Sequence, residues 1–336
     1  MRRVFVGALL VLALPACAAR APSTGGTGPP PLVEVDVATG LDTVWALAFA
    51  PDGSLHATER GGTIKSWQPS GDGRYQEAAF TEVGGVVESG EAGLMGLAID
   101  AKARWFVMYT SDRENRIARL EPDGSQKVLV EGIAAGSVHD GGRLAFGPDG
   151  MLYASTGDAG DKAGAPHSPL NGKVLRVDPD TGEHEVFSTG HRNPQGLCFA
   201  PNGKLFSTEH GPDEGDEVNI LEEGRDYGWP ETVGTGLANY TPTIAPSGCA
   251  VYEADLIPQW KGDLLFGTLK DESLRRLDLD PDGELVGQER LYAGEFGRIR
   301  DVVVGPDGAV YLATSNRDGR GDPRDDDDRI VRIAPA

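Results

Sequence analysis

The chain has 336 residues, of which 52 are aspartate or glutamate and 31 are lysine or arginine, so its formal net charge is −21. A chain this acidic is not expected to bind nucleic acids or anionic membrane surfaces, because both carry negative charge themselves. The length is sufficient for one large domain with a substantial buried core.

The first 16 residues have the pattern of an export signal. Two arginines precede an apolar run at residues 4–14, which is too short to span a bilayer as a helix. The run leads into Leu-Pro-Ala-Cys at residues 14–17, which resembles the lipobox of bacterial lipoproteins. We therefore expect residues 1–16 to be removed as a signal peptide and Cys17 to be lipidated, with plain cleavage nearby as the alternative. Either outcome exports the protein.

Residues 17–31 are rich in glycine, proline, serine and threonine, which is typical of a flexible tether. The remaining residues, 32–336, are expected to form one folded domain. With a lipid on Cys17, this domain is expected at a bacterial membrane or cell surface, on the periplasmic side, with the lipid anchor as its only contact with the membrane.

A strand–turn–strand pattern recurs four times along the predicted domain. Each copy has an alternating apolar strand, a Pro-Asp-Gly or Pro-Asn-Gly turn and a second alternating strand. Proline presets the first φ angle of the turn, the acid or amide caps its own backbone, and glycine adopts positive φ. The four copies are residues 46–59, 143–156, 196–209 and 301–314.

The spacing of the copies predicts two more. The turn prolines lie at positions 51, 148, 201 and 306, so two of the three gaps are about twice the third. We expect degenerate copies near residues 100 and 255, and assign them to Gly96–Tyr109 and Gly262–Leu277. Six repeats of about fifty residues predict an all-β fold, a six-bladed β-propeller with four-stranded antiparallel blades.

The ring of blades must also close. The alternating segment Val33–Val37 is expected to join the last blade beside Arg329–Ile333, which would fasten the two ends of the domain together. No amphipathic helix of normal length is apparent, which argues against a parallel α/β fold. The sequence leaves open whether Cys198 and Cys249 form a disulfide or remain buried thiols.

Polar motifs fall on loops that enter or leave the predicted strands, where a propeller places its binding site. His139 precedes the third repeat, and Asp158 follows the second strand of that repeat. An imidazole held by a carboxylate is suited to act as a general base near neutral pH. The alternative is a turn histidine and a capping aspartate.

Two further loops flank the fourth repeat. Arg192 and Asn193 lie side by side on a Gly/Pro-rich loop, and this pair suits an anionic, oxygen-rich ligand. The acidic loop Glu209–Glu217, followed by Tyr227-Gly-Trp-Pro, suits a hard cation such as calcium. The alternatives are structural hydrogen bonds for the first loop and simple solvation for the second.

Three cations lie at the ends of later strands: Lys270, Arg298 and Arg300. Arginines two apart on a strand point to the same face. In so acidic a chain, these cations favour a multiply anionic ligand in the channel, with ion pairs between blades as the alternative.

In this order and spacing, the motifs resemble those of the soluble PQQ-dependent glucose and aldose sugar dehydrogenases, also called glucose/sorbosone dehydrogenases. The likeness extends from about residue 41 to residue 333. The motifs that carry it are Glu91-Ala-Gly-Leu-Met-Gly-Leu97, His139-x-Gly-Gly-Arg143, Gly157-Asp158, Arg192-Asn193-x-Gln195-Gly196, the 209–217 loop with Tyr227-Gly-Trp-Pro230, and Arg298-x-Arg300.

The resemblance implies oxidation of aldose sugars at the anomeric carbon to lactones. Hydride would pass to pyrroloquinoline quinone (PQQ), and electrons would pass on to an external acceptor such as a quinone, a cytochrome or a dye. By the same resemblance, His139 is the base that deprotonates the anomeric hydroxyl, and Asp158 orients it. Arg192 would stabilise charge on the quinone oxygen, and Asn193 would hydrogen-bond the cofactor.

The resemblance also implies how the cofactors are held. Lys270, Arg298 and Arg300 would pair with the three PQQ carboxylates. Backbone carbonyls of Gly211 and Pro212 would hold a calcium ion that polarises the quinone.

A second, structural calcium is implied, held by a carboxylate matching Glu217 and a backbone carbonyl matching Tyr227. Its other ligands in the family come from a loop that residues 233–240 of this chain do not match.

Departures from the family's glucose-specific members favour the broader aldose enzymes. Glu91 stands where those members have a glutamine at the sugar pocket, and Val138 stands where they have an acid. Their dimer regions have no match here, so a monomer is expected.

Two rival functions remain open: a calcium-dependent sugar lactonase of the same architecture, and a non-catalytic, surface-anchored propeller that binds a partner protein. Fold alone does not separate them.

Overall fold

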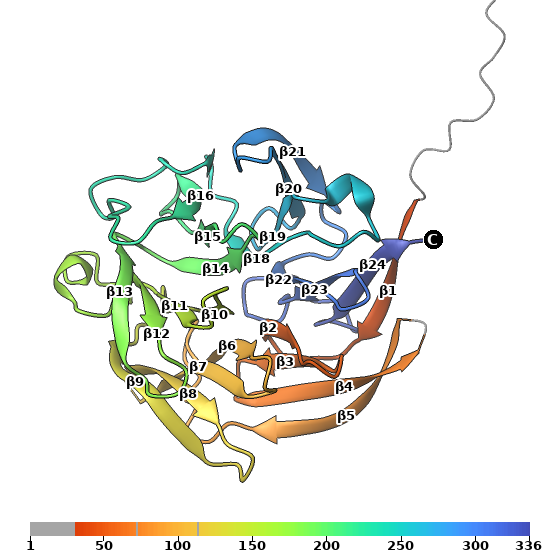
Figure 1. The fold of residues 1–336 in the computed structure, drawn as a ribbon, viewed down its shortest axis with the longest axis horizontal. Coiled ribbons are helices and arrows are strands. Elements are labelled where there is room, and N and C mark those ends of the chain that lie inside the picture. The colour runs from red at the N-terminus through yellow and green to blue at the C-terminus, as the bar shows by residue number, and fades with distance from the viewer. Residues whose placement is uncertain (1–30, 72, 113) are drawn as a thin grey trace, which may run out of the picture.

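A computed structural model describes residues 31–71, 73–112 and 114–336. The expected signal peptide, the lipid site at Cys17 and most of the tether lie outside these residues. The described chain folds into six antiparallel four-stranded sheets, arranged as blades in a ring (Figure 1). This confirms the prediction of an all-β, six-bladed propeller. Within the described ranges, no helix has the length and apolar character needed to cross a membrane.

Five blades follow the chain in order. The first blade comprises β2 (Val44–Phe49), β3 (Leu55–Glu59), β4 (Thr63–Gly71) and β5 (Arg74–Glu82). The second comprises β6 (Leu94–Ile99), β7 (Trp105–Ser111), β8 (Glu114–Leu120) and β9 (Gln126–Ala134). The third comprises β10 (Gly141–Phe146), β11 (Leu152–Thr156), β12 (Lys173–Val177) and β13 (His184–Thr189). The fourth comprises β14 (Pro194–Phe199), β15 (Leu205–Glu209), β16 (Asp216–Leu221) and β17 (Ala238–Tyr240). The fifth comprises β18 (Pro246–Val251), β19 (Leu264–Thr268), β20 (Leu274–Leu279) and β21 (Leu285–Leu291). The first strand of each blade contacts the first strands of its neighbours and so lines the centre of the ring.

The sixth blade closes the ring with both ends of the domain. It contains β22 (Ile299–Val304), β23 (Val310–Thr314), β24 (Ile330–Pro335) and, as its outer strand, β1 (Leu32–Ala38). The register pairs Glu34 with Ile333 and Asp36 with Val331. This confirms the expected pairing of the N-terminal segment with the last strand.

The four clear repeats form the first two strands of their blades, as predicted. In the first copy, Gly53 has a φ of 84° and donates its N–H to the carbonyl of Ala50 at 2.9 Å. Glycine adopts this left-handed conformation without the steric cost that other residues incur. The turn therefore depends on the glycine of the motif.

The assignment for the fifth blade was wrong by one strand. Gly262–Leu277 falls on β19 and β20, the second and third strands, whereas the innermost strand is β18. The expected position near residue 255 lies between β18 and β19, where the short 3₁₀ helix η2 (Pro258–Trp260) replaces the Pro-Asp-Gly turn. The sequence of β18, Pro-Ser-Gly-Cys-Ala-Val, has no alternating apolar pattern to mark it.

Cys198 on β14 and Cys249 on β18 form a disulfide, with their Cα atoms 5.8 Å apart. The bond joins the innermost strands of the fourth and fifth blades. The two cysteines, whose state the sequence left open, are therefore paired and are not free thiols.

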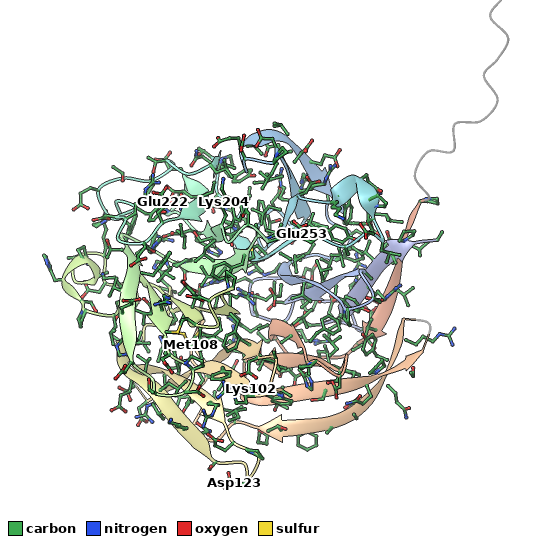
Figure 2. The ribbon with its side chains drawn as sticks, viewed as in Figure 1. Lys102, Met108, Asp123, Lys204, Glu222 and Glu253 are labelled. Atoms are coloured by element: carbon green, nitrogen blue, oxygen red, sulfur yellow. A yellow bond between two sulfur atoms is a disulfide. The ribbon has the colours of Figure 1, made fainter. Side chains whose placement is uncertain are left out.

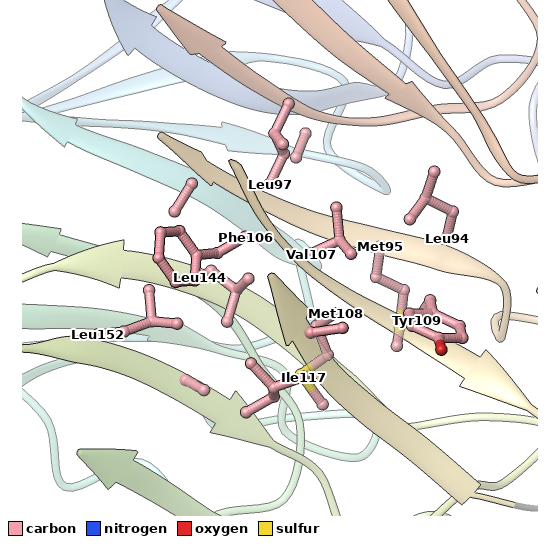
Figure 3. Close-up of a cluster of buried hydrophobic side chains, with 14 of the residues drawn as sticks. Leu94, Met95, Leu97, Phe106, Val107, Met108, Tyr109, Ile117, Leu144 and Leu152 are labelled. Atoms are coloured by element: carbon pink, nitrogen blue, oxygen red, sulfur yellow. The ribbon is translucent and has the colours of Figure 1, made fainter. Parts of the chain in front are cut away.

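The hydrophobic core lies between the blades, where side chains of neighbouring sheets fill the space (Figure 2). Phe106 and Ile117 of the second blade pack with Leu144 and Leu152 of the third (Figure 3). Burying a side chain of this size contributes about 1.5–3 kcal/mol. These contacts fix the blades, and with them the loops that carry the polar motifs.

Candidate active site

His139 and Asp158 meet at one end of the third blade. His139 precedes β10 and Asp158 follows β11, and because the two strands are antiparallel, these positions lie at the same end. The Nδ1 atom of His139 lies 2.8 Å from Oδ1 of Asp158. The predicted dyad is therefore assembled by the fold.

Two further donors fix the Asp158 carboxylate. Trp229 donates its Nε1–H to Oδ2 at 3.0 Å, and Gly160 donates its backbone N–H to Oδ1 at 2.8 Å. Burial raises the pKa of Asp158, but the hydrogen bonds from His139 and Gly160 outweigh burial and keep the pKa below its usual value. Asp158 is thus an anion that holds Nδ1 of His139, which leaves Nε2 for a substrate.

The backbone of His139 has a left-handed conformation, with a φ of 61°. Its carbonyl accepts the N–H of Ala159 at 3.0 Å, and its own N–H donates to Oε2 of Glu91 at 3.1 Å. A Cβ atom at Gly157 would lie 1.9 Å from the His139 carbonyl oxygen, so only glycine fits there. This close approach therefore requires the glycine of the Gly157-Asp158 motif.

Glu91 uses both carboxylate oxygens within the chain. Oε2 accepts the N–H of His139, and Oε1 pairs with Arg320. Burial raises the pKa of Glu91, but the hydrogen bonds from Arg320 and from His139 outweigh it and bring the pKa to about 2. The expected sugar-contacting residue is thus an anion held by a guanidinium.

Arg192 lies on the loop before β14. Its backbone N–H donates to Glu209, its Nη1 donates to the carbonyl of His210 at 3.1 Å, and its Cζ lies 5.4 Å from the ring centre of Trp229. Its neighbour Asn193 is buried and accepts the N–H of Gly141 at 3.2 Å. These contacts fix the loop that carries both predicted cofactor residues.

The dyad and Arg192 open onto one cavity of about 410 Å³. Pro212 and Trp229 also line this cavity. The fold therefore brings together the predicted base, the predicted charge-stabilising arginine and one predicted calcium ligand.

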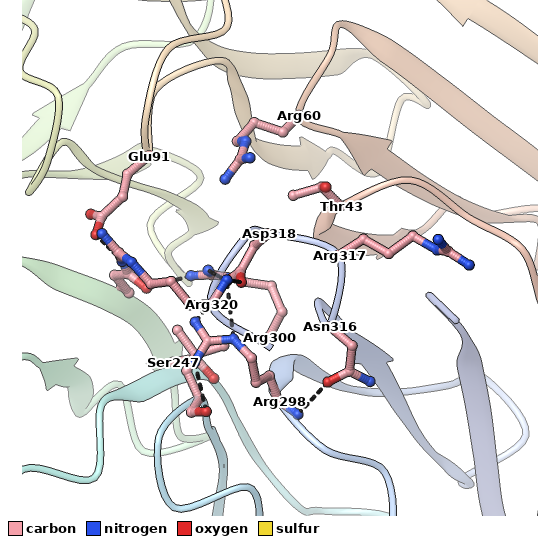
Figure 4. A network of polar contacts seen from close by, with 12 residues as sticks. Thr43, Arg60, Glu91, Ser247, Arg298, Arg300, Asn316, Arg317, Asp318 and Arg320 are labelled. Atoms are coloured by element: carbon pink, nitrogen blue, oxygen red, sulfur yellow. Dashed lines mark hydrogen bonds and ion pairs between the residues drawn. The ribbon is translucent and has the colours of Figure 1, made fainter. Parts of the chain in front are cut away.

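Arg298 directly precedes the innermost strand β22 and Arg300 is its second residue; we call these two buried residues the channel arginines (Figure 4). Arg298 Nη2 lies 2.6 Å from Oδ2 of Asp318, and Arg300 Nη2 lies 3.5 Å from the same oxygen. Both side chains therefore face the same way, as their spacing predicted. Arg300 also donates to Oε1 of Gln195 at 2.6 Å.

Lys270 follows β19 and is exposed. Its backbone N–H donates to Ile244 at 3.1 Å, and the carbonyl of its neighbour Leu269 accepts a hydrogen bond from Arg298 at 2.9 Å. The loop of Lys270 thus adjoins the channel arginines. No ion pair joins Lys270 to any other described residue.

Positive charge exceeds negative charge around the channel arginines. Their cluster, with the ion pairs that adjoin it, has four guanidinium groups and three carboxylates: Arg143, Arg298, Arg300 and Arg320 with Glu91, Asp301 and Asp318. The Nε atom of Arg300 is buried without a hydrogen-bond partner among the described residues. Burial lowers the pKa of Arg300 to about 10, so it remains cationic near neutral pH. An uncompensated buried cation is costly, and a bound anion would relieve it.

The predicted calcium ligands divide into two groups. Gly211 and Pro212 lie on the loop between β15 and β16, where the backbone of Gly211 is fixed by Oδ1 of Asp216 at 2.8 Å. In the part of the chain that the structure describes, neither carbonyl of this pair accepts a hydrogen bond. Two free carbonyl oxygens beside the cavity suit a calcium ion.

The carboxylate of Glu217, unlike the carbonyls of Gly211 and Pro212, accepts hydrogen bonds within the chain. Its Oε1 accepts the N–H groups of Gly234 and Thr235, and its Oε2 accepts the amide of Asn219 at 2.9 Å. Tyr227 donates its hydroxyl to the carbonyl of Ile220 at 2.6 Å. Across the described ranges, no group of three or more acidic, histidine or cysteine side chains is placed to hold a metal. Each carboxylate oxygen has two lone pairs, and Oε2 of Glu217 has a single donor, so the second calcium site at Glu217 and the Tyr227 carbonyl stays a prediction.

Three residues that contact the predicted site residues are not indicated by the sequence. Trp229 belongs to a loop motif, which gives no sign that its indole holds Asp158. Asp318 and Arg320 lie between β23 and β24, in a stretch that belongs to no repeat. The density of charged residues is the one sequence feature of that stretch that could have pointed to Asp318 and Arg320.

The fold and the site define a β-propeller enzyme with a histidine–carboxylate pair and an arginine on one cavity. A family model described as Glucose / Sorbosone dehydrogenase matches residues 41–322. The chain belongs to this family, which is a family of oxidoreductases.

Relatives that align over most of their length support the same assignment. The aldose sugar dehydrogenase YliI of Escherichia coli is 31% identical over 350 residues, which cover 86% of this chain and 92% of that protein. Quinoprotein glucose dehydrogenase B of Acinetobacter calcoaceticus is 25% identical over 420 residues, which cover 88% of this chain and 87% of that protein. The PQQ-bound structure of an aldose sugar dehydrogenase from Streptomyces coelicolor is 36% identical, with a TM-score of 0.80, and covers 91% of this chain and 99% of its own.

Proposed function

We propose that this protein is a PQQ- and calcium-dependent aldose sugar dehydrogenase that oxidises the anomeric carbon to a lactone and passes electrons to an external acceptor. The observation that carries the proposal is the His139–Asp158 pair, which lines the same cavity as Arg192. The PQQ-bound relative from Streptomyces coelicolor and the quinoprotein from Acinetobacter calcoaceticus support the choice of cofactor.

His139 removes the proton of the anomeric hydroxyl at Nε2, because Nδ1 is held by Asp158. The Asp158 anion stabilises the imidazolium that forms. Arg192 faces the same cavity and stabilises negative charge that develops across from the base. When bound, PQQ supplies an electrophilic carbonyl that accepts the hydride from the sugar, and calcium supplies a Lewis acid.

The residues present fit a tricarboxylate cofactor. The channel arginines are buried, the cluster around them has one positive charge in excess, and one guanidinium nitrogen lacks a partner within the described chain. Lys270 lies on the adjoining loop and would supply a third cation. The carbonyls of Gly211 and Pro212 would hold the calcium.

The test is reconstitution of the purified apoprotein. It would be mixed with PQQ, with calcium, with both, or with neither, and assayed for bleaching of a dye acceptor driven by a panel of aldoses. Activity that needs both additions supports the proposal. Lactone hydrolysis with metal alone would support a lactonase instead. If the protein shows neither sugar oxidation nor lactone hydrolysis, the result would support a binding module.

We further propose that the protein is exported and held at the membrane surface by a lipid on Cys17. The Leu-Pro-Ala-Cys sequence at residues 14–17 motivates this. Full-length protein and Cys17→Ser would be expressed in a bacterium and fractionated. The wild type should be recovered with membranes and the variant in the soluble periplasmic fraction, whereas a soluble wild type would contradict the anchor.

A further inference from the structure

A continuous series of contacts leads from the channel arginines toward the predicted base (Figure 4). Asp318 accepts hydrogen bonds from Arg298 Nη2 at 2.6 Å and lies 3.5 Å from Arg300 Nη2, in both cases through Oδ2. Its other oxygen, Oδ1, accepts the backbone N–H of Arg320 at 2.9 Å. One buried carboxylate therefore joins the two channel arginines to the loop that carries Arg320.

The series continues across the ring. The guanidinium of Arg320 pairs with Oε1 of Glu91, on the connection between the first and second blades. Oε2 of Glu91 accepts the backbone N–H of His139 at 3.1 Å. A loop of the last blade thus reaches the main chain of the base through a single carboxylate.

His139 needs such support. Its φ of 61° is a conformation that residues other than glycine keep only where their surroundings hold them. Its carbonyl accepts the N–H of Ala159 and its N–H donates to the carboxylate of Glu91, so each backbone polar group of His139 has one hydrogen-bond partner. Loss of the Glu91 contact would leave the N–H side without a partner and allow the imidazole to move.

We propose that Glu91 and Arg320 are positioning residues for His139, and that Asp318 ties them to the arginines that would hold the cofactor. The proposal rests on the proposed function for the role of His139 as the base. It gives Glu91 a task other than the expected contact with sugar. Since both of its oxygens serve donors of this chain, Glu91 acts on the main chain of the base.

The test compares four variants in apoprotein and in protein loaded with PQQ and calcium. Glu91→Leu removes the acceptor, Glu91→Gln keeps an acceptor oxygen, and Arg320→Ala frees Glu91. Glu88→Gln is the matched control, because Glu88 lies on the same connection and, among the residues that the structure describes, pairs only with Arg60, at 3.0 Å. The readouts are hydrogen exchange of the His139 amide in the apoprotein, PQQ affinity, kcat and KM.

Glu91→Leu should accelerate exchange of the His139 amide and lower kcat by roughly 10- to 100-fold with KM unchanged, because small displacements of a reacting group are costly. Arg320→Ala should act in the same direction, and Glu91→Gln should recover most of the loss. Glu88→Gln should match the wild type. Normal exchange and normal kcat in Glu91→Leu would overturn the proposal, as would an equal loss in the control.

The two proposals fail separately. If the wild type oxidises no sugar with PQQ and calcium, the proposed function fails, while the exchange measurement on apoprotein still decides whether Glu91 holds His139. If sugars are oxidised but the Glu91 variants behave as the wild type, only the positioning proposal fails.

Discussion

The Nδ1 atom of His139 lies 2.8 Å from Oδ1 of Asp158, although 19 positions separate them in the chain. The indole of Trp229 holds the other oxygen of the same carboxylate at 3.0 Å. The imidazole is thus fixed in orientation and in tautomer, with Nε2 left free of Asp158.

Asp158→Asn should therefore lower kcat by at least roughly 10²-fold, because an amide stabilises neither the required tautomer nor the imidazolium. PQQ affinity should change little, since the channel arginines form their ion pairs with Asp318 and not with Asp158. Steady-state kinetics and a PQQ titration would check both. Near-normal turnover in this variant would show that the pair is structural.

The channel arginines should determine cofactor affinity. Arg298→Ala combined with Arg300→Ala should weaken PQQ binding at least about 100-fold, because each hydrogen bond between charged groups contributes about 1.5–3 kcal/mol. Because this change leaves Asp318 buried and unpaired, Arg298→Lys with Arg300→Lys serves as a second variant that keeps the charge and loses the guanidinium forks.

Arg332→Ala is the control for this experiment, since Arg332 belongs to the same blade and pairs with Asp307, 2.7 Å away. Equilibrium titration of PQQ into each apoprotein gives the affinities. Equal affinity in the wild type and in both double variants would mean that the cofactor binds elsewhere.

The Glu91 ion pair should make the free energy of unfolding depend on pH in the acid range. The pKa of Glu91 is about 2 in the folded protein, against a usual value of 4.5, so its contribution is complete above pH 4.5 and is lost as the pH falls toward 2. The shift corresponds to a stabilisation on the order of 3 kcal/mol. Urea unfolding of apoprotein should show a larger gap between wild type and Glu91→Gln at pH 7 than at pH 3. A gap that does not change with pH would contradict this assignment.

The disulfide between the fourth and fifth blades should stabilise the ring. Replacing Cys198 and Cys249 with serine should lower the free energy of unfolding by about 2–4 kcal/mol, mainly by freeing the unfolded chain. Thermal unfolding of the double variant beside the oxidised wild type would measure the loss. Equal melting temperatures would show that the bond contributes nothing to the stability of the ring.

Much of the architecture could be predicted because turn chemistry is local. The Pro-Asp-Gly and Pro-Asn-Gly turns mark four blades directly, and their spacing indicates the other two. The fifth blade was misplaced because β18 lacks alternation and η2 stands where the turn would be. Pairing of Cys198 with Cys249 depends on how two blades pack, which the repeat pattern does not specify.

The site was predictable where its residues flank strands. His139, Asp158 and Arg192 lie just before or after repeats, so their common end of the ring follows from strand direction. Asp318 and Arg320 lie in an irregular connection; Asp318 pairs with arginines of its own blade, and Arg320 pairs with Glu91 on the connection between the first and second blades. Contacts of this kind arise only once the ring is assembled.

The most direct measurement is a single turnover without an external acceptor. Protein loaded with PQQ and calcium would be mixed rapidly with an aldose carrying hydrogen or deuterium at C1, and the spectrum of the cofactor would be followed. The wild type should reduce its cofactor with a primary isotope effect, and His139→Gln should bind PQQ normally but react roughly 10²- to 10⁴-fold more slowly. Reduction in His139→Gln at the wild-type rate would contradict the assignment of His139 as the base.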